Sequence, residues 1–441
     1  MSTTWGPRDE DRAGGAALIL DLTPAHDVRI DAGTKGFPAL TGSVRAVDVA
    51  AAGWSLPRDL RAPVMTLRAT ALDHNLALMA SFCRNHDVDL VPHGKTTMAP
   101  QLWDRQLEAG AWGITAATVA QAAVMRSVRV PRILLANELV DGPSIDWVAA
   151  QLGDPDFDFV CYVDSLRGVA ILEERLGAAG APRPLGVLVE IGHEGGRTGC
   201  RTVDAALEVA GAVAASKRLE LAGAAGYEGT IGEGRSLDAM TAVSAFVDRL
   251  GELARGLLER GAVRDGAIVS AGGSVFFDVV ADRLREALPE GSGARIALRS
   301  GCYLTHDHGT YERNSPFSGR ADPALRFHPA IELWGRVLSR PEPSLALLGF
   351  GRRDAPFDTG MPVPLSIHSP SGDPTRAARG IEVERLNDQH AFCRVDPKTP
   401  LEVGELVACG ISHPCTAFDK WRVLPVVDDH LRVVDAVATF F

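Results

Sequence analysis

The segment VDLVPHGKTT, residues 88–97, joins a short apolar run to a polar loop that contains a lysine. Val88–Pro92 is typical of a buried strand, and Lys95 lies two to three residues past its end. A lysine amine held at such a place can form an imine with a carbonyl compound. The alternative is an exposed loop lysine, the usual environment of this residue type. Lysines are scarce here, five among 45 basic residues, so this position is a stronger signal than usual.

Outward from this segment, short apolar runs alternate with longer segments of helical periodicity such as Thr118–Arg126 and Ser236–Glu259. Eight alternations predict a (β/α)8 barrel over residues 69–310, in the α/β class. A doubly wound parallel sheet is the alternative, because periodicity does not distinguish a closed sheet from an open one. The runs predicted as strands are Val88–Pro92, Ala111–Ala116, Arg132–Ala136, Phe157–Val163, Leu185–Ile191, Leu219–Ala225, Ala267–Ala271 and Arg295–Leu298.

The composition changes after about Tyr311, where prolines cluster and short alternating runs such as Glu332–Ser339 and Ala391–Val395 appear. We therefore predict a second, β-rich domain over residues 311–441. Residues 1–68 are expected to form an N-terminal segment that joins this β domain in part.

Composition excludes several classes of protein. The 441 residues carry a net charge of −11, which argues against nucleic acid or an acidic membrane as a partner. No apolar run reaches the roughly 18 residues needed to cross a bilayer. The seven cysteines form no CxxC pair, and the first residues lack the apolar region of an export signal. We therefore expect a cytoplasmic protein with reduced thiols.

The loops after the later strands contain residues suited to binding a phosphorylated ligand. The loop after the fifth run contains Arg197, whose guanidinium can bond a planar acceptor, and Tyr227 follows the sixth run. Gly272, Gly273 and Ser274 follow the seventh, and Gly301, Cys302 and Tyr303 follow the eighth. Glycine-bearing loops at these two places form the usual phosphate site of barrels. Taken singly, each loop is equally consistent with an ordinary strand-to-helix turn.

A candidate metal site lies in the β domain. His413 and Cys415 are two residues apart, and on an extended segment both side chains would point the same way. Imidazole and thiolate suit a borderline-soft ion such as Zn²⁺. A chance pair is the alternative without further ligands, although His390 is a candidate third ligand. The residues His306–His308 form a second polar cluster.

These motifs, in this order, resemble those of the fold-type III pyridoxal 5′-phosphate (PLP) enzymes of the D-serine dehydratase / D-threonine aldolase family. The similarity covers about residues 60–425 and is greatest to the branch called cryptic D-serine deaminase or amino acid deaminase. Its most specific parts are Pro92–Thr96 and His413–Thr416. The resemblance implies an alanine-racemase-like (β/α)8 barrel with a C-terminal β domain, assembled as a homodimer, with the strand at Val64–Leu67 in the β domain.

The resemblance also implies roles for the candidate residues. Lys95 would be the lysine that binds PLP, and Arg197 would contact the cofactor ring or its 3′-oxygen. Tyr227 would border the ring. Gly272, Gly273, Ser274, Gly301 and Cys302 would hold the phosphate, with Tyr303 beside them. His413 and Cys415 would bind a divalent metal, Zn or Mn.

The expected activity is a PLP- and metal-dependent dehydratase of D-serine, D-threonine or D-threo-3-hydroxyaspartate that releases a 2-keto acid and ammonia. The runner-up is an aldolase, in which His93 or His306 would take the proton of the β-hydroxyl. Two further hypotheses are a non-catalytic PLP-binding protein and a metal-dependent barrel hydrolase. Ser412 precedes His413 where the family usually has an asparagine, and this affects substrate preference more than metal binding.

Overall fold

Eight parallel strands form the predicted barrel in the structure, a computed structural model that describes residues 5, 20–232, 234–369 and 374–441. Seven neighbouring pairs are hydrogen-bonded as a sheet, and the first and last strands of that sheet are β4 and β5. The barrel is closed between them, because the N–H of Trp112 donates to the Leu90 carbonyl at 2.8 Å and the N–H of Thr115 donates to the Pro92 carbonyl at 2.9 Å. In sheet order the strands are β4 (Asp89–Leu90), β11 (Arg295–Leu298), β10 (Ile268–Ala271), β9 (Leu219–Gly226), β8 (Leu185–Ile191), β7 (Asp158–Val163), β6 (Arg132–Glu138) and β5 (Ile114–Ala116).

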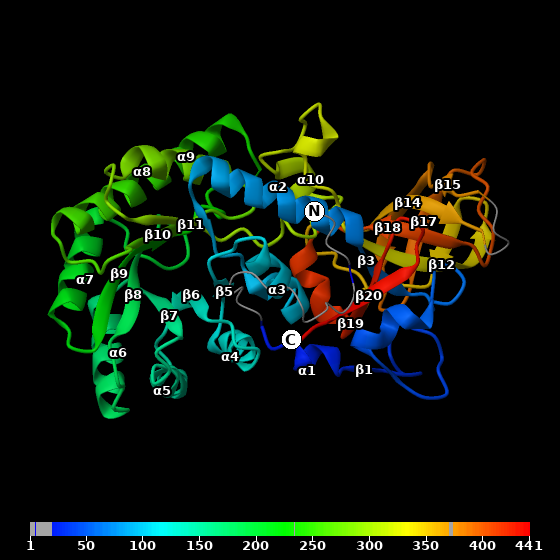
Figure 1. Ribbon diagram of the computed structural model, residues 1–441. Helices are drawn as coiled ribbons and strands as arrows, with labels where there is room; N and C mark the ends of the chain where they lie inside the picture. Colours follow the sequence, from blue (N-terminus) through cyan, green and yellow to red (C-terminus); the bar gives the residue numbers. More distant parts are fainter. Residues whose placement is uncertain (1–4, 6–19, 233, 370–373) are drawn as a thin grey trace.

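Helices surround the strands, as Figure 1 shows for the left-hand part of the molecule. Five of these helices begin at a short polar side chain after a strand: Thr118, Asp141, Ser165, Thr202 and Ser236 each accept a backbone N–H of the first helical turn. The barrel helices are α2 (Ala69–His86), α3 (Pro100–Glu108), α4 (Val119–Ser127), α5 (Gly142–Gln151), α6 (Leu166–Ala178), α7 (Val203–Ala215), α8 (Leu237–Glu259) and α9 (Phe277–Ala287).

The inside of the barrel is a separate small core. Side chains from β6 to β11 point inward and meet at the axis, together with Val91, which directly follows β4. Its buried members are Val91, Leu134, Val160, Tyr162, Leu188, Ala222, Ala225, Ile268 and Ala297. Most of the interior is therefore filled with side chains, and ligands must bind at its ends.

The C-terminal part of the chain forms a β domain beside the barrel, on the right in Figure 1. Its sheet has the order β15-β14-β18-β12-β13-β17-β16. The early strand β3 (Val64–Arg68) pairs antiparallel with β12 and parallel with β19. The other strands are β12 (Ile331–Glu342), β13 (Leu345–Leu348), β14 (Val363–His368), β15 (Arg376–Ala377), β16 (Ile381–Leu386), β17 (Ala391–Val395), β18 (Leu406–Gly410), β19 (Val423–Val427) and β20 (Val433–Ala438).

Short elements complete the described chain. The helix α10 (Thr310–Asn314) leads from the barrel to the β domain, and α1 (Thr23–His26) and the hairpin of β1 (Arg29–Ile30) and β2 (Val44–Arg45) precede β3. Among the described residues, no helix has both the length and the apolar character needed to cross a bilayer.

Candidate active site

The Lys95 loop lies at the carboxyl end of β4, where barrel active sites form. Gly94–Thr96 makes one turn of 3-10 helix directly after His93. A Cβ atom on Gly94 would lie 2.8 Å from Cγ2 of Ile114, so glycine lets this turn pack closely against β5. Lys95 is half-buried, and no described residue hydrogen-bonds or ion-pairs with its amine. The amine is therefore available for reaction.

His93 adjoins Lys95 and is anchored to the last strand of the barrel. Its N–H donates to the Arg299 carbonyl at 3.2 Å. The ring is half-buried, and its Nδ1 atom is closed off from solvent without a partner among the described residues. Burial, followed by the positive charges of Lys95 and Arg299, holds the pKa of His93 well below its usual value. The imidazole is therefore neutral at pH 7, with a free nitrogen.

Arg197 and Tyr227 come from the loops after β8 and β9 and contact each other. The guanidinium carbon of Arg197 lies 4.4 Å from the centre of the Tyr227 ring. The Arg197 loop is closed at its base, where the N–H of Gly192 donates to the Cys200 carbonyl at 2.8 Å. Burial raises the pKa of Tyr227, which keeps the phenol uncharged. The structure thus brings these two predicted residues together.

The loops after β10 and β11 lie side by side, as a phosphate site requires. The Gly272 carbonyl accepts from the N–H of Arg299 at 3.1 Å and from the Ser300 hydroxyl at 3.1 Å. The N–H groups of Gly272 and Gly273 are bonded to the buried carboxylate of Glu228, at 3.1 and 2.5 Å. These two glycines therefore shape the loop, and their N–H groups already have an acceptor.

Other backbone donors at these loops make no hydrogen bond to a described residue. Among them are the N–H groups of Ser274, Gly301 and Cys302. Free N–H groups at adjacent turns form an anion-binding concavity. Together with the free amine of Lys95, this donor set fits a phosphorylated aldehyde such as PLP.

Cys415 of the β domain reaches the Lys95 loop. Its Sγ atom lies 3.4 Å from the Thr96 hydroxyl and 3.3 Å from Sγ of Cys302. The contact with Cys302 lowers the pKa of Cys415 well below its usual value. Burial opposes this shift, and His413 adds to it. The thiolate is the form of cysteine that binds metals.

His413 is oriented by Asp358, a residue that the sequence analysis missed. Nδ1 of His413 lies 2.6 Å from a carboxylate oxygen of Asp358, and the Thr416 hydroxyl donates to the other oxygen at 2.8 Å. Burial would lower the pKa of His413, but Cys415 and Asp358 outweigh it and raise the pKa to about 9. A carboxylate on one ring nitrogen leaves the other for a metal, so the donor set fits a borderline-soft ion.

The expectation that His413 and Cys415 lie on one extended segment is wrong. Pro414–Thr416 forms a turn of 3-10 helix, because the fixed φ of proline suits the first position of such a turn. The two side chains face each other across this turn, and each affects the pKa of the other. His390, the candidate third ligand, is exposed in the hairpin between β16 and β17.

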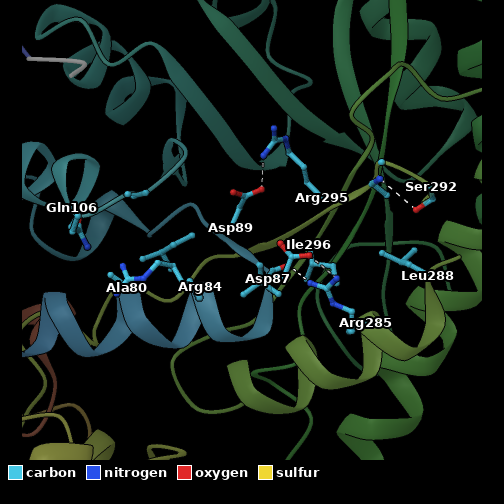
Figure 2. Close-up of a pocket in the computed structure, with 18 of the residues that line it drawn as sticks. Ala80, Arg84, Asp87, Asp89, Gln106, Arg285, Leu288, Ser292, Arg295 and Ile296 are labelled. Atoms are coloured by element: carbon cyan, nitrogen blue, oxygen red, sulfur yellow. Dashed lines mark hydrogen bonds and ion pairs between the residues drawn. The ribbon is translucent and has the colours of Figure 1, made fainter. Parts of the chain in front are cut away.

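Two predicted residues have other surroundings in the structure. The Tyr303 hydroxyl accepts from the Gln106 side chain at 3.1 Å, and Tyr303 lines a cavity of about 990 Å³ that includes the starts of β4 and β11. Figure 2 shows this cavity and its paired charges, such as Asp89 with Arg295 at 2.7 Å. It lies at the amino ends of the strands, away from the Lys95 loop. His306 lies 3.2 Å from Glu312 and packs against Phe327.

Arg299 and Tyr311 lie at the site but were not among the candidate residues selected from the sequence, because their partners are far away in the chain. Arg299 lies beneath the loops, where its guanidinium donates to the Ser270 hydroxyl at 2.7 Å and the Gly226 carbonyl at 2.6 Å. Tyr311 borders the candidate metal ligands His413 and Cys415, with its ring centre 6.4 Å from that of His413. A sequence signal existed for Glu228 and Arg299, because each is a charged residue next to a predicted strand end. No local pattern distinguishes Asp358.

A family model described as "Putative serine dehydratase domain" matches residues 330–427, which lie in the β domain. The D-threonine aldolase of an Arthrobacter species is 26% identical over 371 residues, which cover 83% of this chain and 89% of that protein. The 3-hydroxy-D-aspartate aldolase of Paracoccus denitrificans (strain Pd 1222) is 24% identical over 306 residues, 69% of this chain and 75% of that protein.

Solved structures of enzymes with similar names superimpose on most of this chain. The D-threonine aldolase from Filomicrobium marinum superimposes with a TM-score of 0.73 at 26% identity, over 88% of this chain and 97% of that chain. The D-threo-3-hydroxyaspartate dehydratase from Delftia sp. HT23 has the same fold, with a TM-score of 0.69 at 19% identity over 86% and 98% of the two chains.

Proposed function

Because this chain belongs with the fold-type III enzymes of the D-serine dehydratase / D-threonine aldolase family, we propose that it is a PLP- and metal-dependent dehydratase of D-β-hydroxy amino acids. One observation carries the proposal: the Lys95 loop of the barrel and the His413–Cys415 turn of the β domain meet, with Thr96 and Cys415 3.4 Å apart. A reactive amine and a metal-ligand pair therefore share one site.

Residues already described would hold the two groups. Lys95 would bind PLP covalently, the free N–H groups of Ser274, Gly301 and Cys302 would bind its phosphate, and Arg197 and Tyr227 would contact its ring. His413 and Cys415 would bind Zn²⁺ or Mn²⁺. When bound, PLP would act as an electron sink for the substrate's Cα, and the metal would polarise the β-hydroxyl.

The chain's own groups would then move the protons. The Lys95 amine would take the proton from Cα of D-serine, D-threonine or D-threo-3-hydroxyaspartate. Tyr311 would donate a hydrogen bond to the departing hydroxyl without losing its proton, because burial, followed by the charges of Cys302 and Cys415, raises its pKa well above the usual value and keeps the phenol uncharged. The α-proton and hydroxide leave as water. The enamine then takes up one water and yields a 2-keto acid and ammonia.

An aldolase reaction is the second candidate, and two observations favour it. The relatives at 24–26% identity are aldolases, and the imidazole of His93, which is neutral and adjoins Lys95, would accept the proton of the β-hydroxyl. The Cα–Cβ bond would then break to give glycine and an aldehyde.

The test has three parts. The purified protein should show an absorbance band near the short-wavelength edge of the visible range from bound PLP. Lys95→Ala should abolish this band, and the control Lys217→Ala should leave it in place. An unchanged spectrum of Lys95→Ala would contradict the role of Lys95. With D-threonine, 2-oxobutyrate and ammonia identify the dehydratase, whereas glycine and acetaldehyde identify the aldolase. EDTA should reduce turnover, and Zn²⁺ or Mn²⁺ should restore it.

We also propose a homodimer, which light scattering during size-exclusion chromatography would detect as twice the 46.8 kDa chain mass.

A further inference from the structure

Three carboxylates meet at the barrel mouth on consecutive strands. Glu138 is the last residue of β6, Asp164 follows β7 directly, and Glu190 is the next-to-last residue of β8. One oxygen of each lies within 4.8 Å of the other two. Since alternate residues of a strand share a face, Glu138 and Glu190 point inward with the core residues Leu134 and Leu188. The three form one cluster at the carboxyl ends of the strands, which we call the acidic triad.

The acidic triad has few partners among the described residues. Both carboxylate oxygens of Glu138 and one of Glu190 are closed off from solvent and accept no hydrogen bond. Asp164 accepts the Gly199 N–H at 3.0 Å, which fixes its position. No described lysine, arginine or histidine forms an ion pair with any of the three, and Arg197 stacks on Tyr227 instead.

Tyr162 provides an observation that is independent of the carboxylates. It lies on β7 between β6 and β8, is 2% exposed, and its hydroxyl has no hydrogen-bond partner among the described residues. Burial raises its pKa, the Arg299 guanidinium 5.8 Å from its ring opposes this shift, and the charges of Glu190 and Glu138 add to it, so the phenol adjoins the acidic triad. A buried, unpartnered hydroxyl is costly, because no water replaces the lost hydrogen bond.

Protons and a cation are the two ways to neutralise such a cluster. Burial and the adjacent Glu190 carboxyl raise the pKa of Glu138 to about 9, so one proton is held between them when no cation is bound. A single shared proton makes one hydrogen bond. It leaves a second oxygen of Glu138 and the Tyr162 hydroxyl unsatisfied. A cation with several oxygen ligands would engage the converging oxygens together and free the phenol to donate to a remaining lone pair.

We propose that Glu138, Asp164 and Glu190 bind a hard divalent cation of the Mg²⁺ or Mn²⁺ class, at a site separate from the His413–Cys415 pair. Three carboxylates select hard ions, whereas imidazole and thiolate select softer ones, so the two sites would discriminate between metals. This inference does not depend on which reaction the enzyme catalyses.

Terbium(III) luminescence tests the site directly, because Tb³⁺ prefers oxygen ligands and is excited through nearby tyrosine. We expect EDTA-treated protein with PLP bound to take up one Tb³⁺, which excess Mg²⁺ or Mn²⁺ displaces. The double variant His413→Ala/Cys415→Ala should bind Tb³⁺ equally well. Glu138→Gln should weaken binding at least tenfold, and Glu138→Asp should restore part of it.

Two results would overturn the proposal. One is equal Tb³⁺ affinity in the wild type and in Glu138→Gln. The other is no stoichiometric binding to a wild type whose near-ultraviolet circular dichroism is normal, which would mean that a shared proton neutralises the acidic triad. If Glu138→Gln does not fold, electron paramagnetic resonance of Mn²⁺ on His413→Ala/Cys415→Ala decides: one bound ion supports the site, and none contradicts it.

Discussion

His308 lies in the connection from the barrel to the β domain. Its N–H donates to the Ile411 carbonyl at 3.0 Å, and its Nδ1 atom is closed off from solvent without a described partner. Burial lowers the pKa of this histidine to about 4. The unfolded chain has a histidine pKa near 6.5, so it binds more protons than the folded chain between pH 4 and 6.5. Stability therefore rises with pH across this window.

We predict that His308→Gln reduces the loss of stability on acidification. The buried histidine makes the wild type less stable at pH 4 than at pH 6.5 by up to about 3 kcal/mol, at 1.36 kcal/mol per pKa unit. Urea unfolding at both pH values measures the difference. The exposed His390→Gln is the control and should behave like the wild type. An unchanged pH dependence in His308→Gln would show that His308 can be protonated without cost in the folded state.

Asp358 gives a second test at the level of one residue. A carboxylate that orients a metal-binding imidazole typically contributes 10–100-fold to affinity. Asp358→Asn should therefore weaken Zn²⁺ binding by roughly this factor, as measured by competition with a chromophoric chelator. Asp419→Asn, in the next turn of the chain, is the matched control. Equal affinity in Asp358→Asn and the wild type would contradict the orienting role.

At the scale of elements, the strands could be predicted because each barrel strand is buried on both faces and reads as a continuous apolar run. Each of the eight predicted runs overlaps one barrel strand, although β4 is limited to Asp89–Leu90. Lys95 could be found because it follows such a run. Asp358 could not, because it approaches His413 only through folding of the β domain, 55 residues away in the chain. The turn at Pro414 was not predicted, because the argument from side-chain spacing took no account of the fixed backbone φ of proline.

Gly301 joins the loop after β11 to the Lys95 loop. A Cβ atom here would lie 2.6 Å from the His93 carbonyl oxygen, a backbone atom that cannot move aside cheaply. Gly301→Ala should therefore cost about 1–3 kcal/mol of stability and weaken PLP binding. Gly211→Ala, in α7 with no atom within 4 Å of the added Cβ, should instead stabilise by about 0.5–1 kcal/mol. Thermal unfolding and PLP titration measure both variants. Equal behaviour of the two would mean that the loops do not pack against each other.

At the scale of the whole molecule, β3 makes the β domain discontinuous in sequence. Val64–Leu67 pairs residue by residue with Ile331–Trp334, and the N–H of Arg68 donates to the Ala330 carbonyl at 2.7 Å. Residues 311–441 alone lack this central strand, which also pairs with β19.

We predict that the isolated fragment 311–441 does not fold, because β12 and β19 would each lose a neighbour. Because β3 and β12 are antiparallel and adjacent, a short Asn-Gly turn between Arg68 and Ala330 should join them as a hairpin. A fragment of residues 54–68, this turn and residues 330–441 should then show cooperative thermal unfolding by circular dichroism. Cooperative unfolding of 311–441 alone would contradict the prediction.

Because β3 pairs with β12, it must wait during synthesis until its partner strand has been made. A ribosome adds β12 roughly 260 residues after β3, which at 5–20 residues per second is a delay of about 15–50 s. Within that interval the whole barrel emerges and can fold, since all its strand pairs are already present, while β3 has no partner. The edge of β3 is then exposed to other nascent chains. The β domain, with Cys415 and His413, is completed last, so the half of the candidate site that it supplies forms on a barrel that has already been made.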